Sequence, residues 1–353
     1  MILQIIRRAT KAVLVSALAA CTIGLASCDS VIYDDEGDCT VHYRVPFTYT
    51  QNILSANAFA SQVTGVTLYV FDSGGKLVLR KTDSGPALAT NGYKMDVELQ
   101  PGTYSMVAWC TGTSPMSDHT AFEIGGGASP ASISDLSATL PLNGSEGGYY
   151  VDSDITPLFH GMVTNVVCKR DAYGYIDLPA IDLMKDTNVI KVILENLDGS
   201  EMMKGDFSVE ITADNSCMDY LNNVVGDTPL AYRSWSTTML ASEREEARAG
   251  GDEAQTPSGM MTENTTGRFI VGRRPMLKVI RNEDSKEIIN LDLLSYLVRV
   301  KGHYQGHLTD QQYLDRMDEH TLAFFIDADK NWYMAGGISI NGWHIVPDQN
   351  EDL

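Results

Sequence analysis

Apolar and polar residues alternate along much of the chain, beginning with Val41, Tyr43, Val45 and Phe47, which share one parity. A period of two places such residues on one face of a half-buried β-strand. Residues 66–71 form a run of β-branched and aromatic residues that ends in a glycine-rich turn, and a second apolar run follows. This order predicts a β-hairpin.

Similar short segments recur to the end of the chain. We expect strands at residues 41–47, 66–71, 77–79, 95–99, 103–109, 162–168, 189–194, 207–211, 269–271, 275–280, 322–326, 332–335 and 338–346. Residues 310–320 are the best helix candidate, because Asp310 can serve as N-cap and Tyr313 and Met317 share a helical face. Short strands with polar turns, and no regular alternation of strands with long helices, predict an all-β fold with minor α content built from β-sandwiches.

The character of the sequence changes along the chain and suggests its division. Residues 1–27 have the features of a leader, and residues 28–38 form an acidic tether. Residues 39–180 and 181–353 each hold enough expected strands for one β-sandwich domain. A charged, apolar-poor stretch near residues 242–258 interrupts the second domain, and we expect a mobile loop there.

The leader has the pattern of a lipoprotein signal peptide. Three basic residues precede an uncharged apolar run that ends at Leu25. The run is shorter than the roughly 20 apolar residues of a membrane-spanning helix. Small residues then lead to Cys28, as in the lipobox of bacterial lipoproteins, whose cysteine thiol receives a diacylglycerol. Cleavage at Cys21, or an ordinary secretory signal, are the alternatives.

The formal net charge of −20 excludes a class of partners. Nucleic acid is bound through many Lys and Arg contacts to phosphate, so we expect no nucleic-acid partner. Four cysteines remain after the lipobox, and they match no zinc-ligand spacing. In an exported protein they are either candidates for disulfides or buried free thiols. These cysteines are Cys39, Cys110, Cys168 and Cys217.

Candidate chemical motifs fail on their own requirements. His303 and His307 lie four residues apart, but a zinc protease needs a glutamate after the first histidine, where this chain has Tyr304. The residues after Asp327 begin like a calcium loop but lack its glycine and its final glutamate. Asp152 and Asp154 are close together without a partner base, so we interpret them as part of a solvated loop.

Four tryptophans are scattered along the chain, and packing in the core is favoured over a sugar-binding platform. They are Trp109, Trp235, Trp332 and Trp343. We therefore expect no catalytic residue, no metal site and no cofactor, and we do not expect an enzyme.

Several segments, taken in order, resemble one family. The resemblance is carried by the lipobox with its acidic tether, Phe47-Thr48-Tyr49, Asn52, Phe59, residues 66–72, 159–162, 187–192 and 313–316, and residues 338–343. Together they resemble the anchoring subunits of type V fimbriae, the fimbrillin-A-associated anchor proteins. Each motif alone is weakly specific, whereas the ordered set spans nearly the whole mature chain.

The resemblance implies two tandem transthyretin-like β-sandwich domains. It also implies a lipid-anchored, surface-exposed subunit that tethers a fimbria to the outer membrane and influences its length. The implied partner is a fimbrial shaft subunit, a pilin. Shaft pilins of this type lose their lipidated segment to an Arg-specific protease. Here no Lys or Arg lies between Cys28 and Arg44, and Arg44 lies inside an expected strand, so we expect the lipid to stay.

Strand addition at an exposed sheet edge is the expected mode of pilin binding, because main-chain hydrogen bonds supply much of its affinity. The final apolar stretch is the candidate contact strand, although a buried structural strand is the other interpretation. Its candidate contact residues are Ile338, Ile340, Trp343 and Ile345. A glycan-binding surface lipoprotein built from tandem β-sandwiches is the alternative function.

Overall fold

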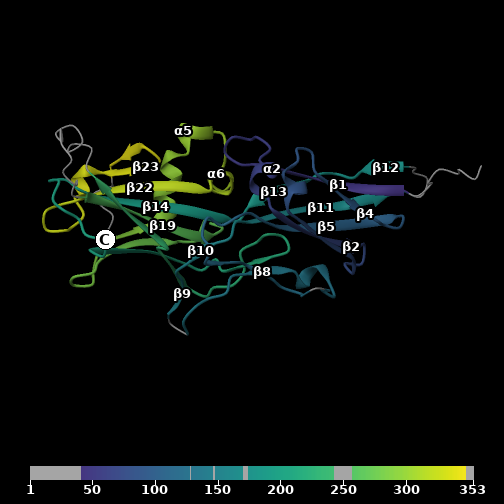
Figure 1. Ribbon diagram of the computed structural model, residues 1–353, viewed down its shortest axis with the longest axis horizontal. Coiled ribbons are helices and arrows are strands. Elements are labelled where there is room, and N and C mark those ends of the chain that lie inside the picture. Colours follow the sequence, from purple (N-terminus) through teal and green to yellow (C-terminus); the bar gives the residue numbers. More distant parts are fainter. Residues whose placement is uncertain (1–40, 128, 146–147, 170–173, 242–256, 347–353) are drawn as a thin grey trace, which may run out of the picture.

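The computed structural model describes residues 41–127, 129–145, 148–169, 174–241 and 257–346. Most of them lie in β-strands, and the molecule is elongated along the strands (Figure 1). The strands that precede residue 186 are β1 (Val41–Gln51), β2 (Gly65–Asp72), β3 (Leu77–Ser84), β4 (Lys94–Val97), β5 (Gly102–Thr111), β6 (His119–Thr120), β7 (Glu123–Ile124), β8 (Ser137–Thr139), β9 (Tyr149–Val151), β10 (Asp154–Ile155), β11 (Leu158–Cys168), β12 (Gly174–Asp177) and β13 (Ile181–Lys185).

The later strands are β14 (Thr187–Asn196), β15 (Phe207–Ala213), β16 (Cys217–Asp219), β17 (Leu230–Arg233), β18 (Ser236–Ala241), β19 (Pro257–Gly267), β20 (Met276–Arg281), β21 (Lys286–Asp292), β22 (Glu319–Ile326), β23 (Ile338–Ile340) and β24 (Trp343–Ile345). The helical elements are α2 (Phe59–Gln62), η1 (Pro86–Ala89), η2 (Ile133–Asp135), α4 (Leu293–Leu297), η3 (Val298–Val300), α5 (Gly302–Gln305), α6 (Asp310–Arg316) and η4 (Met334–Gly336). This composition confirms the all-β prediction.

The first half is an eight-stranded sheet in the order β12-β1-β13-β11-β5-β2-β3, with β4 also bonded to β1. Strand β1 changes partners near Pro46. Before it β1 pairs with β12 and β4, and after it with β13. The alternating residues Tyr43, Val45 and Phe47 are buried in the core of this half, as their parity predicts.

The second half is a sandwich of two sheets. One sheet has six strands in the order β18-β19-β14-β22-β23-β24, and the other has five in the order β21-β20-β15-β17-β9. Ile190 and Val192 of the first sheet share one core with Val209 and Ile211 of the second. The apolar periodicity of β14 and β15 therefore buries one face of each sheet against the other.

The two halves exchange short strands. Strand β16, late in the sequence, pairs with β8, and Met218 packs in a third apolar cluster on the outer face of the first sheet. Conversely, β9, which comes early in the sequence, pairs in parallel with β17 of the second half. The covalent crossing between the halves lies at Asp186, because β13 still belongs to the first sheet. The division after residue 180 that the sequence predicts therefore cuts that sheet.

Three expected strands differ from the structure. Residues 338–346 form two strands, because Asn341 and Gly342, with φ of 50° and 83°, make a hairpin turn. Residues 332–335 run into the 3₁₀ turn η4, and residues 269–271 form only an isolated bridge before Gly272. An apolar run of three or four residues does not distinguish a strand from an anchored loop.

The expected helix is confirmed as α6, but its N-cap is Thr309 rather than Asp310. It also ends at Arg316, and residues 319 and 320, which were expected to be helical, begin strand β22. The Thr309 hydroxyl accepts from the Gln312 amide, and the Gln312 side chain accepts from the Thr309 amide, which forms a capping box. The stretch expected as a mobile loop lies outside the described residues from 242 to 256, and β19 begins at Pro257.

Candidate functional site

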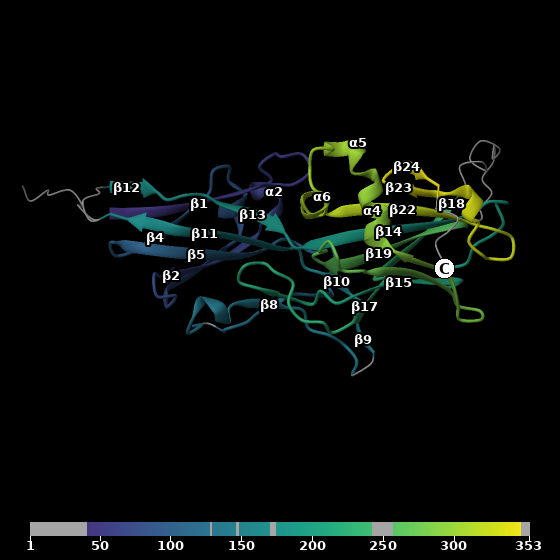
Figure 2. The ribbon, with the colours of Figure 1, turned by 180° about the vertical axis from the view of Figure 1, so that it is seen from behind.

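The C-terminal hairpin β23–β24 forms one margin of the six-stranded sheet (Figure 2). Ile338 and Ile340 are fully buried in β23, between β22 and β24. Each lies opposite one of the other two candidate contact residues, because Ile338 pairs with Ile345 and Ile340 pairs with Trp343. Directly paired residues share a face of a sheet, so all four side chains point to the same side.

That side is already covered by the protein. The Trp343 ring, 43% exposed, stacks on the ring of His303 from α5, with ring centroids 3.7 Å apart and planes 6° apart. Ile345 packs partly buried against the core of the second half. Ile338, Ile340 and Ile345 therefore contribute to internal packing. The accessible parts of β24 are the side chains of Trp343 and His344 and the main chain at the sheet edge.

The hydrogen-bonding pattern of the hairpin identifies those main-chain groups. A two-residue turn makes Ile340 and Trp343 a hydrogen-bonded pair, as are Ile338 and Ile345. The N–H and C=O of His344 therefore point away from β23. Because β24 is the last strand in the order of its sheet, these groups face the sheet edge.

The first strand is held at the opposite end of the molecule. Within β1, Arg44 pairs with Asp177 of β12 on one side and Asp96 of β4 on the other. Its guanidinium forms an ion pair with Asp177 at 2.9 Å, and Lys94 reaches the same carboxylate at 2.5 Å. The Lys94 hydrogen bond and the Arg44 charge lower the pKa of Asp177. Arg44 is thus paired along both edges of its strand.

A polar cluster surrounds Asp186, the single residue between β13 and β14. Its carboxyl is fully buried and accepts a hydrogen bond of 2.7 Å from the Asn222 amide. Arg268 forms a two-point ion pair with Asp315 nearby, at 2.8 and 3.0 Å. Burial raises the pKa of Asp186 to about 7, and the charge of Arg268 opposes that rise. The junction between the halves is therefore packed and internally bonded.

Three of the cysteines that are disulfide candidates carry free thiols in the structure: Cys110, Cys168 and Cys217. Cys110 and Cys168 lie at opposite ends of the β5–β11 ladder, so their Cα atoms are separated by far more than the roughly 7 Å limit for a disulfide. Burial raises the pKa of both thiols. Cys39 and the proposed lipidation site Cys28 lie outside the described residues.

The candidate calcium loop and the candidate acid pair are held by hydrogen bonds within the protein. Asp327 accepts hydrogen bonds from the amides of Asp329 and Asn331, as expected of a turn. Asp154 is buried rather than solvated, because the hydroxyls of Ser114 and Thr265 donate to its carboxylate. Across the described ranges, no group of three or more potential ligands is placed to hold a metal ion. The sequence did not reveal Asp154 as buried because its two partners are distant in the chain.

The tryptophans do not form a platform. Trp109 and Trp332 are buried, and the Trp235 indole donates to the Thr265 hydroxyl. Of the four, Trp343 is the one with an exposed side chain. Among the helices that the structure describes, none is long and apolar enough to cross a membrane.

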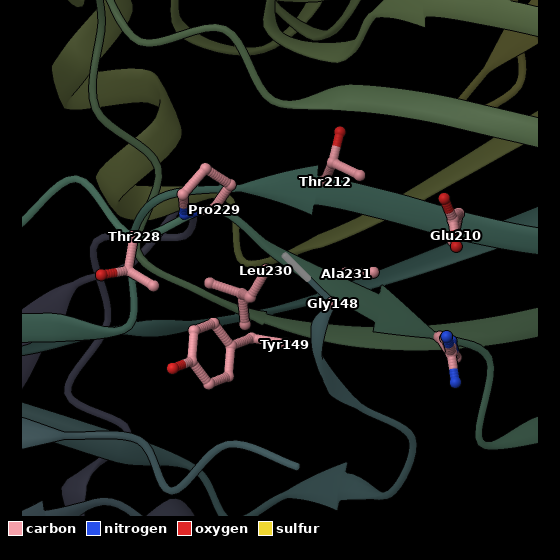
Figure 3. Close-up of a pocket in the computed structure, with 9 residues that line it drawn as sticks. Gly148, Tyr149, Glu210, Thr212, Thr228, Pro229, Leu230 and Ala231 are labelled. Carbon is pink, nitrogen blue, oxygen red and sulfur yellow. The ribbon is translucent and has the colours of Figure 1, made fainter. Parts of the chain in front are cut away.

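The five-stranded sheet has a hollow of about 520 Å³ on its outer face (Figure 3). Tyr149, Thr228 and Leu230 line one side of it, and Glu210 lies across from them. Arg233, the cross-strand partner of Glu210, places its guanidinium over the ring of Tyr150, 4.0 Å from the ring centroid. The hollow offers a carboxylate, hydroxyls and an aromatic ring to a polar ligand, but no catalytic arrangement.

Known structures share this architecture. A candidate adhesin from Bacteroides thetaiotaomicron is 28% identical, with a TM-score of 0.71, over 89% of this chain and 100% of that chain. A candidate polysaccharide-binding protein of the same species is 24% identical, with the same TM-score and coverage. The fimbrial anchor protein Mfa2 of Porphyromonas gingivalis is 17% identical, with a TM-score of 0.58, over 88% of this chain and 100% of that chain. The last two likenesses concern the fold alone.

The sequence has no match among curated proteins. It does match the family described as "Fimbrillin-A associated anchor proteins Mfa1 and Mfa2" over residues 35–348. That match spans both halves of the structure, from the residues before β1 to those after β24. The chain therefore belongs to the family of fimbrillin-A associated anchor proteins and is a fimbria-associated protein.

Proposed function

We propose that the protein is a lipidated anchoring subunit, fixed at the outer membrane by acyl chains on Cys28, which holds a fimbria at the cell surface and influences its length. Family membership supports a fimbrial role. The observation that carries the anchoring role is the pairing of β1 along both of its edges. An anchor must keep the segment that connects its lipid to its folded body.

The position of Arg44 supports retention of that segment. It is the first arginine after Cys28, so an Arg-specific protease has no earlier target between them. Cleavage requires a segment that unfolds locally into an extended, unpaired form. Release of Arg44 would separate this part of β1 from β12 and β4, and would break the hydrogen bond from the Leu178 amide to the Arg44 carbonyl together with the ion pair to Asp177. The lipidated N-terminus therefore stays attached.

The proposed contact with the first pilin is the free edge of β24. Strand addition needs unpaired main-chain groups, and those of His344 face a sheet edge that pairs with no other strand in the part of the chain that the structure describes. This contact uses the main chain of the predicted segment, whereas Ile338 and Ile340 are occupied in the core. Which of the two partners donates the added strand is a property of the complex.

Mass spectrometry of the membrane fraction tests retention of the lipid. We expect the N-terminal peptide to begin at acylated Cys28, and the Cys28→Ser variant to leave the membrane fraction. An unacylated soluble product, or mature protein that starts at Val45, would overturn the proposal. Deletion of the gene followed by electron microscopy tests the role in the fimbria: detached or overlong fimbriae are expected, and unchanged fimbriae would contradict it.

Substitution of His344 tests the contact edge. His344→Pro removes the outward N–H and leaves the inner ladder with β23, whereas His344→Ala removes only the imidazole. We expect the proline variant to lose co-purification with the pilin and the alanine variant to keep it, with both folded by circular dichroism. Equal pilin recovery from both variants would exclude this edge.

The alternative, a glycan-binding surface lipoprotein, is favoured by one observation, the hollow lined by Tyr149, Glu210 and Thr228. Glycan arrays with the Tyr149→Ala and Glu210→Gln variants separate the two functions. Glycan binding lost in these variants, together with normal fimbriae in the deletion strain, would support the alternative. Absence of glycan binding by the unaltered protein would remove it.

A further inference from the structure

Two parallel ladders, β1–β13 and β14–β22, follow one another along the chain. Strand β1 pairs in parallel with β12 and then with β13. Strand β13 continues through Asp186 alone into β14, and β14 pairs in parallel with β22 over eight residue pairs, from Val189–Glu319 to Asn196–Ile326. Figure 1 shows β1 and β12 toward one end of the long axis and β22 and β23 toward the other.

The direction of these pairs decides how they respond to tension. When the start of one parallel strand is pulled against the end of its partner, the two strands are pulled past each other along their axes. All hydrogen bonds of the ladder then resist together, because they lie across the direction of pulling. In an antiparallel hairpin the same two ends lie side by side, and the bonds open one at a time. Parallel pairs therefore resist this load collectively.

Both pairs of this chain are arranged in the resistant way. A pull on the N-terminus acts at the start of β1, and the opposing pull reaches β13 at its end, through Asp186. The same pull reaches β14 at its start. A load applied at the C-terminal segment acts first on the antiparallel strands β24 and β23, and after they detach it reaches β22 at its end. The two ladders are thus loaded in series and each of them in shear.

Side chains reinforce the first ladder. The Asp182 carboxylate of β13 accepts three hydrogen bonds from β1: from the Thr48 hydroxyl at 2.8 Å, the Thr50 amide at 2.9 Å and the Thr50 hydroxyl at 2.7 Å. Hydrogen bonds to an ionised carboxylate are roughly twice as strong as neutral ones. These three bonds join only the two strands that tension would slide apart. In the second ladder Lys191 and Glu319 form an ion pair between β14 and β22.

We propose that the protein bears mechanical load, through two shear-loaded parallel ladders in series, and that Asp182 fastens the first of them. The proposal rests on the proposed anchoring function only for the source of the load. The strand directions and the Asp182 bonds stand independently of any lipid. Because forced unfolding is governed by the unfolding barrier, bonds across the sheared ladder raise the force that the protein withstands.

Single-molecule pulling tests the proposal on the chain from residue 29 onward, flanked by reference domains at both ends. We expect the main unfolding peak at a force severalfold higher than when the same chain is pulled between its N-terminus and residue 175. That second geometry pulls β1 and β12 apart from their adjacent ends, because Val41 pairs with Gly174. A reactive non-natural residue at position 175 avoids the native thiols. Equal forces in the two geometries would overturn the proposal.

Matched variants locate the fastening bonds. Asp182→Ala removes three bonds across the ladder, and Thr50→Val removes one while keeping the side-chain shape. Asp219→Ala also removes three hydrogen bonds, from Leu221 and Asn223, but all of them lie within one local turn. We expect the end-to-end force to fall in Asp182→Ala, to fall less in Thr50→Val, and to stay unchanged in Asp219→Ala. A similar loss in Asp182→Ala and Asp219→Ala would contradict the assignment.

Failure of this proposal and failure of the anchoring function have different readouts. The pulling experiment contains no lipid and no pilin, so a low unfolding force would refute load-bearing alone. An unacylated product in the membrane assay would refute the anchor without changing the force. If Asp182→Ala does not fold, Thr50→Val still gives a falling or an unchanged force and decides the question.

Discussion

At the scale of single residues, burial controls the ionisation of several side chains. His160 and His320 are buried, and burial lowers the pKa of each to about 4, so both stay neutral at neutral pH. The pKa of Asp186 changes in the opposite direction and is raised, because burial disfavours the ionised carboxylate. Its Oδ2 atom has no hydrogen-bond partner among the described residues. The carboxyl of the residue that joins the two halves is thus held where its ionised form is disfavoured.

We predict that Asp186→Asn removes a pH-dependent destabilisation. The folded-state pKa of about 7 lies above the ordinary aspartate pKa of 3.8, so the native state binds more protons between these values and its stability falls as pH rises. The free energy of unfolding of the variant, minus that of the wild type, should rise by at most about 4 kcal/mol between pH 4 and pH 8. Urea unfolding across this range measures it.

Asp198→Asn is the control with the opposite sign. Hydrogen bonds from Ser200 lower the pKa of the Asp198 carboxyl, so its contribution is present above the unfolded pKa and is lost as pH falls. This variant should therefore lose stability relative to the wild type as pH rises. Parallel pH profiles for the two variants would show that the Asp186 carboxyl is not held protonated.

At the scale of elements, close approach of strands sets which residues fit. In β11, a Cβ atom added to Gly161 would lie 2.5 Å from Ile181 Cγ2 and 2.9 Å from Leu183 Cδ2, both of β13. Glycine therefore lets β13 lie against β11, and β13 in turn carries β1. The terminal hairpin has a local cause instead, because Asn341 and Gly342 accept positive φ at little cost.

We predict that Gly161→Ala lowers the free energy of unfolding by about 1–3 kcal/mol, because the methyl group must displace β13. Gly148→Ala is the matched control, since a Cβ there meets no atom within 4 Å and its φ is not positive. Chemical unfolding should leave that variant within about 0.5 kcal/mol of the wild type. If both substitutions had the same small effect, the spacing between β11 and β13 would not be limiting.

At the scale of the whole molecule, the third of three apolar clusters joins the two halves. The cores of the two halves are separate, and the third cluster joins them through Met218 of β16, which packs with Trp109 and Leu136. Exchange of β9 and β16 makes each half depend on strands from the other. We therefore expect the two halves to unfold together.

We predict that the wild type unfolds in one cooperative thermal transition and that Met218→Ala divides it into two. Removal of a buried methionine costs about 2–5 kcal/mol, and here that loss falls on the contact between the halves. Met260→Ala, inside the core of the second half, should lower the transition temperature without dividing the transition. Differential scanning calorimetry decides, and two separate transitions in the wild type would contradict this coupling.

The sequence by itself determined the local character of the chain. Alternation at Val45 and Phe47 specified the buried face of β1, because side chains of a strand alternate between its two faces. The apolar residues of α6 and the all-β class followed from equally local patterns. The Asn341–Gly342 turn was readable in the same way, since it is a strong hairpin signal, yet the apolar residues around it suggested a single strand.

Only the tertiary structure decided which strands lie together. The parallel partners of β1 and β14 are more than 120 residues away in sequence, and pairing over that distance leaves no mark in either strand. The burial of Asp154 and Asp186, the three bonds on Asp182 and the exchange of β9 and β16 depend on the same long-range contacts. Periodicity fixes which face of a strand is buried, whereas the choice of neighbour comes from the packing of the whole chain.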